Sequence, residues 1–354
     1  PRRRSDRRGL VARARRDRVR GADAVPRGMT LPYRRALITG GTGFIGPYLI
    51  RALLLHAVEI HFLTRRGELP ETLRDITQKI TAHRGDLLNR KGTRDLIRDV
   101  SPEAVFHLAA YGTLPSERDF AHMIAVNITG TTHLLEAVSV SSCRTFVQAG
   151  SVKEYGDHRV PITENTPSSP ADMYGVSKAC ATLVGQYFAR RHRVPVTVLR
   201  CGPVYGPRDL GNRFLPSAIR ASLTGAPFSV AAGKTLRSFL YIDDLIAAYL
   251  RASATPDAAG EIVNIGSPEQ VTYDEVLTRI ERLTGKPITR SVWNEIGATP
   301  ARTLPHGWPL DLTKAKVLLG WEPAVSFDEG LRHTIEWIRQ TMQTTHAASA
   351  RFHP

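Results

Sequence analysis

The chain has 354 residues, 42% of them hydrophobic, and its formal net charge is +15. A chain of this length and apolar content can bury a large core as one α/β unit with a smaller appended lobe. No apolar run reaches membrane-spanning length, because the longest, near 49–58, is interrupted by Arg51 and His56. The three cysteines lack metal-binding spacing, and an odd, unpatterned set indicates a reducing compartment, so we expect a cytoplasmic protein without a bound metal.

Much of the charge lies in the first 28 residues, which hold eleven Arg against three Asp. This segment carries a net +8 and leaves +7 for the rest of the chain. It has no apolar periodicity, and Met29 stands just before the first predicted strand. We therefore predict a disordered basic extension over 1–28, which could be translated sequence upstream of the natural start. Binding to RNA or a membrane is the alternative, but no aromatic residue interleaves the arginines, so we expect neither partner.

The first predicted strand, at 36–39, runs directly into the glycine-rich sequence TGGTGFIG. Apolar positions at helical spacing then predict a helix over 44–57. A strand, a glycine turn and a helix start form an anion site. Gly40, Gly43 and Gly46 permit the tight turn, the approach of a pyrophosphate and the packing of helix on strand. This segment is therefore predicted to bind a dinucleotide.

The second strand, predicted at 59–64, should end near the adenosine ribose of such a dinucleotide. There an acidic residue accepts hydrogen bonds from both hydroxyls of NAD, whereas an arginine accommodates the 2′-phosphate of NADP. Arg65 and Arg66 follow the strand, and no Asp or Glu stands at that position. The sequence therefore favours NADP(H), with NAD(H) as the alternative and two solvated loop arginines as the simpler interpretation.

A second motif, Tyr174-Gly-Val-Ser-Lys178, lies in a predicted helix over 172–191. Tyr and Lys four residues apart project from one helix face. A phenol titrates near ~10, and a neighbouring ammonium moves that pKa towards the working pH, as proton exchange with an alcohol and ketone pair requires. Ser151 follows the strand predicted at 144–150, at the sheet edge where open α/β sheets place their ligands. Together these residues predict nicotinamide redox chemistry.

In this combination the chain resembles the extended short-chain dehydrogenases/reductases, the NAD-dependent epimerase/dehydratase family that acts on nucleotide sugars. The resemblance runs from about Arg35 to Gln340 and rests on TGGTGFIG (39–46), GDL (85–87), HLAA (107–110), VNITGTTHLLEA (126–137), GSVKEYG (150–156), YGVSK (174–178), RCGPVYGP (200–207), RSFLYIDD (237–244) and LGWEP (319–323). It implies a catalytic set of Ser151, Tyr174 and Lys178. It also implies cofactor contacts, to which Tyr174 and Lys178 would contribute, from Gly40, Thr42, Gly43, Phe44, Ile45, Gly46, Asp86, Leu87, Leu108, Ala109 and Ala110.

The alternation of strands and helices predicts the fold class, α/β with a doubly wound parallel (Rossmann) sheet and a smaller, interleaved C-terminal substrate lobe. Further strands are predicted at 80–84, 104–109, 196–200 and, as a returning sheet element, 261–265. His107 reads as a packed core histidine. The expected organisation is a dinucleotide-binding domain over 29–200, a mainly substrate-binding lobe over 201–340 and a flexible tail over 341–354.

The assembly and the reaction are expectations from the same resemblance. The predicted helical stretches 117–140 and 172–191 are the longest, and in the family two such helices from each subunit form a four-helix bundle, so we expect a homodimer. Dehydration is disfavoured, because Glu154 is displaced by one position from the family's pattern and on an extended strand would point to the opposite face. No second base for epimerisation at C3 or C5 is evident.

Two reactions at C4 of a nucleotide sugar need only the Ser, Tyr and Lys set. Reduction of a nucleotide 4-keto-6-deoxyhexose is preferred, and 4-epimerisation with retained NAD is the alternative. The intact catalytic set disfavours a third possibility, a regulator that binds nicotinamide without turnover.

Substrate anchoring departs from the family. Pro203 stands where an Asn often contacts sugar or phosphate, so the identity of the sugar stays open. The resemblance assigns Arg237 to the substrate diphosphate, with Arg302 as its partner. Paired guanidinium and phosphate groups are the chemical reason for arginine at such positions.

Overall fold

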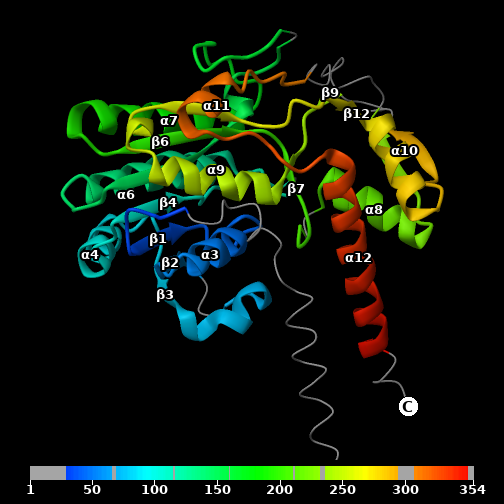
Figure 1. Cartoon of the computed structure of the whole chain (residues 1–354), viewed down its shortest axis with the longest axis horizontal. Coiled ribbons are helices and arrows are strands. Elements are labelled where there is room, and N and C mark those ends of the chain that lie inside the picture. Colours follow the sequence, from blue (N-terminus) through cyan, green and yellow to red (C-terminus); the bar gives the residue numbers. More distant parts are fainter. Residues whose placement is uncertain are drawn as a thin grey trace, which may run out of the picture.

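The computed structural model describes residues 29–65, 69–114, 116–158, 160–209, 212–231, 236–293 and 307–349. The predicted extension over 1–28, Arg66, Arg302 and residues 350–354 lie outside these ranges. At the centre is one parallel sheet in the order β11-β6-β5-β4-β1-β2-β3 (Figure 1). Its strands are β1 (Arg35–Thr39), β2 (Glu59–Thr64), β3 (Ile80–Arg84), β4 (Ala104–His107), β5 (Thr145–Ser151), β6 (Val196–Cys201) and β11 (Ile262–Ile265).

Side chains alternate between the two faces of this sheet, as the period of a strand requires. Ile38 and Phe106 belong to one apolar cluster, whereas Leu37 and Val105 belong to the other. Helices cover both faces because each face is apolar. One face packs on α3 (Gly46–Leu55), α9 (Ile242–Ala254) and α11 (Thr313–Leu319), and the other on α4 (Arg90–Val100), α6 (Gly130–Val138) and α7 (Met173–His192). The predicted doubly wound α/β fold is confirmed.

Local signals fix where several helices begin and end. The side chain of Asn89 accepts a hydrogen bond from the N–H of Gly92 at the start of α4, and Asp172 does the same for Gly175 at the start of α7. Short polar side chains of this kind satisfy backbone donors that a helix leaves unpaired. The remaining short elements are α5 (Phe120–Ile124), the π-helix η2 (Ala125–Thr129), and the 3₁₀ segments η1 (Glu71–Lys79), η3 (Val152–Glu154) and η4 (Pro256–Ala258).

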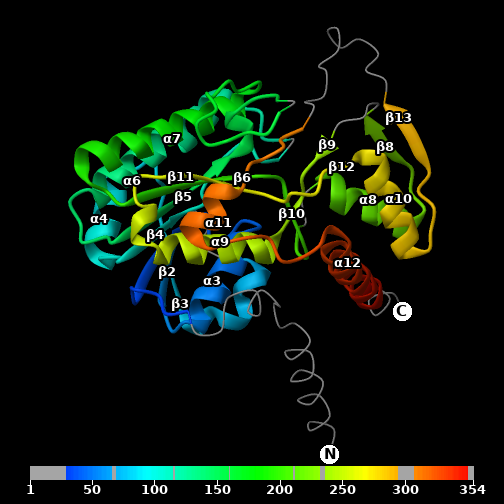
Figure 2. The same cartoon turned by 45° about the horizontal axis from the view of Figure 1, so that its top comes forward.

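A smaller lobe stands beside the carboxyl edge of the sheet (Figure 2). We use the term for α8 (Phe214–Thr224), β8 (Phe228–Ala231), β9 (Leu236–Arg237), β12 (Val271–Thr272), α10 (Tyr273–Thr284) and β13 (Arg290–Trp293). The short pair β7 (Val204–Tyr205) and β10 (Leu240–Tyr241) links it to the sheet, and α12 (Phe327–Ser349) runs along it. Because β11 returns to pair with β6 after α9, the lobe is interleaved with the sheet along the chain.

Two expectations need correction. The strand predicted at 104–109 ends at His107, where the chain turns into the cleft described below. The stretches 117–140 and 172–191 are not the longest helices, because the first divides into α5, η2 and α6 and α7 has 20 residues, whereas α12 has 23. α12 continues through Ser349 into the tail predicted over 341–354, whose flexibility stays a prediction. Among the described residues, no helix is long and apolar enough to cross a membrane.

Candidate active site

A cleft of about 2770 Å³ opens at the carboxyl ends of the central strands. It is lined on one side by the sheet and its phosphate loop, and on the other by the smaller lobe. Ligands of open α/β sheets bind at this edge. Among the described residues, no group of three or more His, Cys, Asp or Glu side chains is placed to hold a metal ion.

The glycine turn after β1 is packed too closely for side chains. Gly40 has φ +73°, and a Cβ added there would lie 2.6 Å from the amide nitrogen of Ala109. A Cβ on Gly46 would lie 2.5 Å from the backbone of Gly41. The N–H of Gly43 donates to the carbonyl of Gly40 at 3.1 Å, which closes the turn. This cradle, followed directly by α3, fits the diphosphate of a nicotinamide dinucleotide.

The other predicted cofactor contacts that the structure describes lie along the same cleft. Arg65 stands exposed at the end of β2 and lines the cleft, whereas Arg66 lies outside the described residues. Asp86 accepts a hydrogen bond from the N–H of Leu88, so its carboxylate is fixed at the sheet edge. The residues that the resemblance assigns to the cofactor all line the cleft: Gly40, Thr42, Gly43, Phe44, Ile45, Gly46, Asp86, Leu87, Leu108, Ala109 and Ala110.

Ser151 is the last residue of β5, and the structure corrects the expectation about Glu154. The chain after Ser151 is the 3₁₀ turn η3, so Glu154 is not on an extended strand. Its carboxylate turns back to accept the Ser151 N–H at 2.7 Å and forms a buried ion pair with Arg200 at 2.8 Å. Glu154 therefore holds the backbone of Ser151 through its N–H and does not face the cleft as a base.

Tyr174 and Lys178 both project from the first turns of α7 into the cleft. Burial raises the pKa of Tyr174 above its ordinary value, and the Glu154 carboxylate adds to the rise. The largest opposing charge is the guanidinium of Arg213, whereas the sequence argument expected the ammonium of Lys178 in that role. Burial also lowers the pKa of Lys178, which is 3% exposed. The phenol is therefore held protonated at neutral pH.

Asn127 is a site residue that the sequence argument did not single out. It lies in η2, the π-helical turn between α5 and α6, and is 1% exposed. Its amide binds both backbone groups of Tyr111, at 2.8 and 2.9 Å, and donates to the Ser177 hydroxyl at 2.9 Å. It thus ties the loop after β4 to the residue preceding Lys178. An Asn inside a helical stretch was the available signal, because Asn is a poor helix former.

The lobe side of the cleft is built from aromatic and cationic side chains. The Arg237 guanidinium lies 4.9 Å from the Trp308 ring centroid and 5.4 Å from that of Tyr273. The ring of Tyr273 in turn packs on Phe214, with centroids 4.2 Å apart. Arg302, the expected partner of Arg237, lies outside the described residues.

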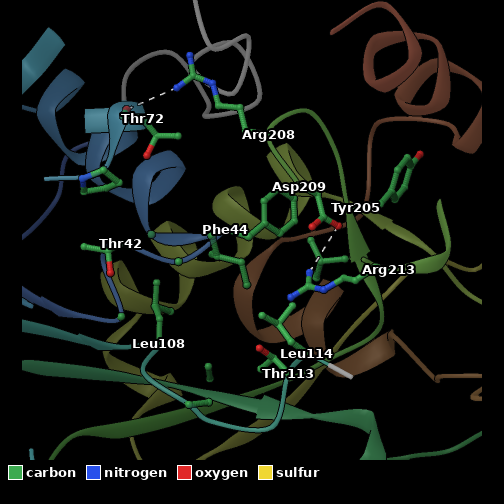
Figure 3. A pocket seen from close by; sticks show the side chains of 18 of the residues that line it. Thr42, Phe44, Thr72, Leu108, Thr113, Leu114, Tyr205, Arg208, Asp209 and Arg213 are labelled. Carbon is green, nitrogen blue, oxygen red and sulfur yellow. Dashed lines mark hydrogen bonds and ion pairs between the residues drawn. The ribbon is translucent and has the colours of Figure 1, made fainter. Parts of the chain in front are cut away.

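Arg213 reaches the centre of the cleft from the residue before α8. Figure 3 shows it beside Thr113 and Leu114, with Asp209 as its ion-pair partner at 3.6 Å. Its guanidinium lies 5.8 Å from the Phe44 ring centroid, across the phosphate loop. No periodicity or motif in the sequence had indicated a role for this residue. The arrangement offers hydroxyl and phenol groups beside a dinucleotide cradle, with cations and rings opposite.

Comparison with known proteins identifies the class that this fold and site define. Residues 36–266 match the model of the NAD dependent epimerase/dehydratase family, and the chain belongs to that family. A Bacillus subtilis protein described as an uncharacterized UDP-glucose epimerase is 30% identical over 327 residues, covering 87% of this chain and 99% of its own. A dTDP-glucose 4,6-dehydratase of Neisseria gonorrhoeae is 30% identical over 331 residues, covering 86% and 95%.

A solved structure gives the same result at the level of the fold. The UDP-glucuronic acid 4-epimerase of Bacillus cereus, in complex with UDP-glucuronic acid and NAD, superposes with a TM-score of 0.78. It is 28% identical, and the alignment covers 87% of this chain and 99% of the epimerase. The protein is therefore an enzyme of the NAD-dependent class that acts on nucleotide sugars.

Proposed function

We propose that the enzyme exchanges hydride and proton at C4 of a nucleotide sugar. The observation that carries this proposal is the convergence of Ser151, Tyr174 and Lys178 on the cleft that also holds the dinucleotide cradle. The hydroxyl and phenol come from different elements, the end of β5 and the start of α7, yet both line one space. Bound NAD(P) would supply or accept the hydride.

The protein's own groups would manage the proton. Negative charge builds on the C4 oxygen when a ketone is reduced, and the protonated Tyr174 phenol is the acid that can neutralise it. Ser151 would donate a hydrogen bond to the same oxygen. In the reverse direction the phenolate would accept the C4 hydroxyl proton, with Lys178 as the neighbouring cation.

Dehydration remains disfavoured, now on geometry. Glu154, the acidic residue nearest to the catalytic serine in the sequence, is engaged by the Ser151 N–H and the Arg200 guanidinium. Removing it from this buried pair would leave Arg200 uncompensated, which is costly. It is therefore poorly placed to exchange a proton with the sugar.

Between the two C4 reactions, the similarity to a UDP-glucuronic acid 4-epimerase bound to NAD supports 4-epimerisation of a UDP-sugar. Reduction of a nucleotide 4-keto-6-deoxyhexose, the preferred reaction on sequence, is the second candidate. The observation that favours it is Arg65 at the end of β2, where NADP-binding proteins place an arginine.

The net consumption of reduced cofactor distinguishes 4-epimerisation from reduction of a 4-keto sugar. Epimerisation is redox-neutral overall, so UDP-glucose or UDP-glucuronate should convert to its C4 epimer with no net NADH. Reduction should consume one NADPH for each 4-keto sugar, followed by the absorbance of the reduced cofactor. Absence of turnover with both panels, by a protein that binds the dinucleotide, would overturn the proposed function.

Cofactor choice is tested by binding. If Arg65 meets a 2′-phosphate, NADPH should bind more tightly than NADH, and Arg65→Ala should weaken NADPH selectively. Equal affinities in the wild-type protein would remove the argument for NADP and leave NAD, as in the solved relative.

The expected homodimer has a candidate surface on α5 and α7. Phe120 and Ile124 are 56% and 43% exposed, and Leu183 and Tyr187 are 65% and 55% exposed. Such apolar side chains on neighbouring helices favour a second copy as partner. Leu183→Glu should convert a dimer to a monomer at micromolar concentration, as measured by light scattering.

The free thiols of Cys143, Cys180 and Cys201 support the reducing, cytoplasmic location expected above.

A further inference from the structure

Arg208 holds an unusual backbone conformation at the mouth of the cleft. Its φ is +66°, in the left-handed region that favours glycine, although it carries a long side chain. The loop is fastened from the sheet side, because the Tyr48 hydroxyl of α3 donates to the carbonyl of Pro207 at 2.6 Å. Strain of this kind persists where the surrounding structure enforces it, and it concentrates at binding sites.

The strained backbone points the guanidinium across the cleft towards η1. Figure 3 shows Arg208 reaching Thr72, whose carbonyl accepts from the Arg208 Nη1 at 3.5 Å. That distance is at the limit of a hydrogen bond. The same carbonyl already accepts a hydrogen bond from Arg51 at 2.7 Å, so its weak contact with Arg208 does not explain why a second arginine lies beside Thr72.

The charges of these two arginines differ. Arg51 is neutralised by Asp75, whose carboxylate oxygens accept from two of its nitrogens at 2.9 and 2.5 Å. Among the described residues the Arg208 guanidinium forms no ion pair, although the Asp75 carboxylate is near enough to interact with it electrostatically. The adjacent Asp209 instead pairs with Arg213. Arg208 thus presents a positive charge inside a cleft that also contains the phosphate cradle and Arg65.

We propose that Arg208 binds a phosphate group in the adenosine half of the nicotinamide dinucleotide, as a clamp that reaches from the segment after β7 to the sheet side of the cleft. The site is made of Arg208 and η1 around Thr72, in the cleft that the glycine turn also lines. This rests on the cofactor use proposed above. The phosphate is either the pyrophosphate shared by NADH and NADPH or the 2′-phosphate of NADPH alone, and a guanidinium suits both.

The test is the dissociation constant of each dinucleotide, measured by fluorescence titration of the full chain. Arg208→Gly removes the guanidinium and suits the left-handed backbone, so it should fold at least as well as the wild type. Arg208→Lys keeps the charge without the planar fork. Arg193→Gly is the matched control, since Arg193 has φ +55° and lies at the end of α7, outside the cleft.

We expect Arg208→Gly to raise the dissociation constant about 10- to 100-fold, the usual range for a lost hydrogen bond to a charged group. An equal rise for NADH and NADPH identifies the pyrophosphate, and a rise for NADPH alone identifies the 2′-phosphate. The dissociation constant of Arg208→Lys should lie between those of the wild type and Arg208→Gly, and that of Arg193→Gly should equal the wild-type value. The wild-type affinity should decrease more steeply with salt than that of Arg208→Gly.

Unchanged affinity of Arg208→Gly for both dinucleotides would overturn the proposal. A loss of equal size at low salt and at 1 M salt would also overturn it, because that result indicates a structural role through Thr72. If the wild-type protein bound neither dinucleotide, the cofactor use itself would fail, and this proposal with it.

Discussion

The two sides of the cleft differ in whether main chain or side chains form the surface. On the sheet side the glycine turn presents main chain, packed so closely at Gly40 and Gly46 that no side chain fits there. On the lobe side the surface is made of side chains, with Arg213 and Arg237 held among aromatic rings. A backbone surface tolerates substitution poorly, because nothing nearby can move, whereas long side chains can be removed singly with graded losses.

The largest effect is expected for Gly46→Ala on the sheet side. The new Cβ would lie 2.5 Å from three backbone atoms of Gly41, so α3 would have to move away from the glycine turn. We expect a loss of more than ~3 kcal/mol in the free energy of unfolding, as for severe overpacking. Chemical denaturation followed by circular dichroism measures it.

Gly43→Ala is the control within the same turn. Its Cβ would meet only the Gly40 carbonyl, at 3.4 Å, which is ordinary contact. This variant should fold normally. If both variants have wild-type stability, the sheet side of the cleft is more adaptable than its geometry indicates.

The second prediction concerns the chemical centre between the two sides. Tyr174→Phe should lower kcat by ~10²-fold or more, the range for general acid–base groups, and leave the affinity for the dinucleotide nearly unchanged. In the proposed function the phenol acts on the reacting oxygen. Steady-state kinetics and a binding titration with the same preparation give both values. A variant that keeps most of its kcat, with chemistry rate-limiting, would refute the role of Tyr174.

The pH dependence of kcat sharpens the same assignment. Because burial keeps the pKa of Tyr174 above its ordinary value, the acid form persists through neutral pH, and ketone reduction should decline only on the alkaline side. A decline that begins at or below pH 7 would indicate that Lys178 and the bound dinucleotide lower the pKa, as the sequence argument expected.

Sequence predicted the sheet side well, for a physical reason. The strands expected at 59–64 and 80–84 are observed with those bounds, and they pair in one parallel register. Two local periodicities suffice to bring Ser151, at a strand end, to Tyr174 and Lys178, four residues apart on a helix. These are short-range features that a linear pattern records.

The lobe side and the supporting contacts were largely missed because they depend on residues far apart in the chain. Trp308 meets Arg237 across 71 positions, and Glu154 reverses direction in a 3₁₀ turn to reach Arg200. The loop that holds the left-handed Arg208 is bound by a hydroxyl from α3. No periodicity encodes such contacts, and the resemblance alone had singled out Arg237.

A graded effect is predicted on the lobe side. Arg237→Ala should raise KM for the nucleotide sugar about 10-fold or more, with kcat little changed, if its guanidinium binds the substrate diphosphate as the resemblance implies. Trp308→Leu should raise KM less, about 3- to 10-fold, the range of a lost cation–π contact. Initial rates over a range of nucleotide-sugar concentrations measure both. If Trp308→Leu matched Arg237→Ala, the ring would contact the substrate itself rather than position the arginine.

The smallest effect is expected on the sheet side, where the buried His107 influences the free energy of unfolding. Its ring joins β1 to α6, with Thr39 on Nδ1 at 2.7 Å and Thr131 on Nε2 at 2.8 Å. Since the Thr131 hydroxyl donates to the Asn127 carbonyl, it accepts from Nε2–H, and in the neutral ring Nδ1 then accepts from the Thr39 hydroxyl. Burial, with Lys178 nearby, lowers the pKa of His107 to about 3.

The sign of the pH effect follows from that pKa. Below the ordinary value of ~6.5 the unfolded chain takes up a proton that the folded protein does not, so acid favours unfolding. This contribution is complete above ~6.5, and it should decrease by about 1 kcal/mol between pH 6 and pH 5. His107→Gln retains an acceptor and a donor but does not titrate, so its free energy of unfolding should fall less over this interval. Parallel curves for the two proteins in urea denaturation would show that His107 is protonated in the folded state, and that the sheet side beneath the glycine turn admits a charge.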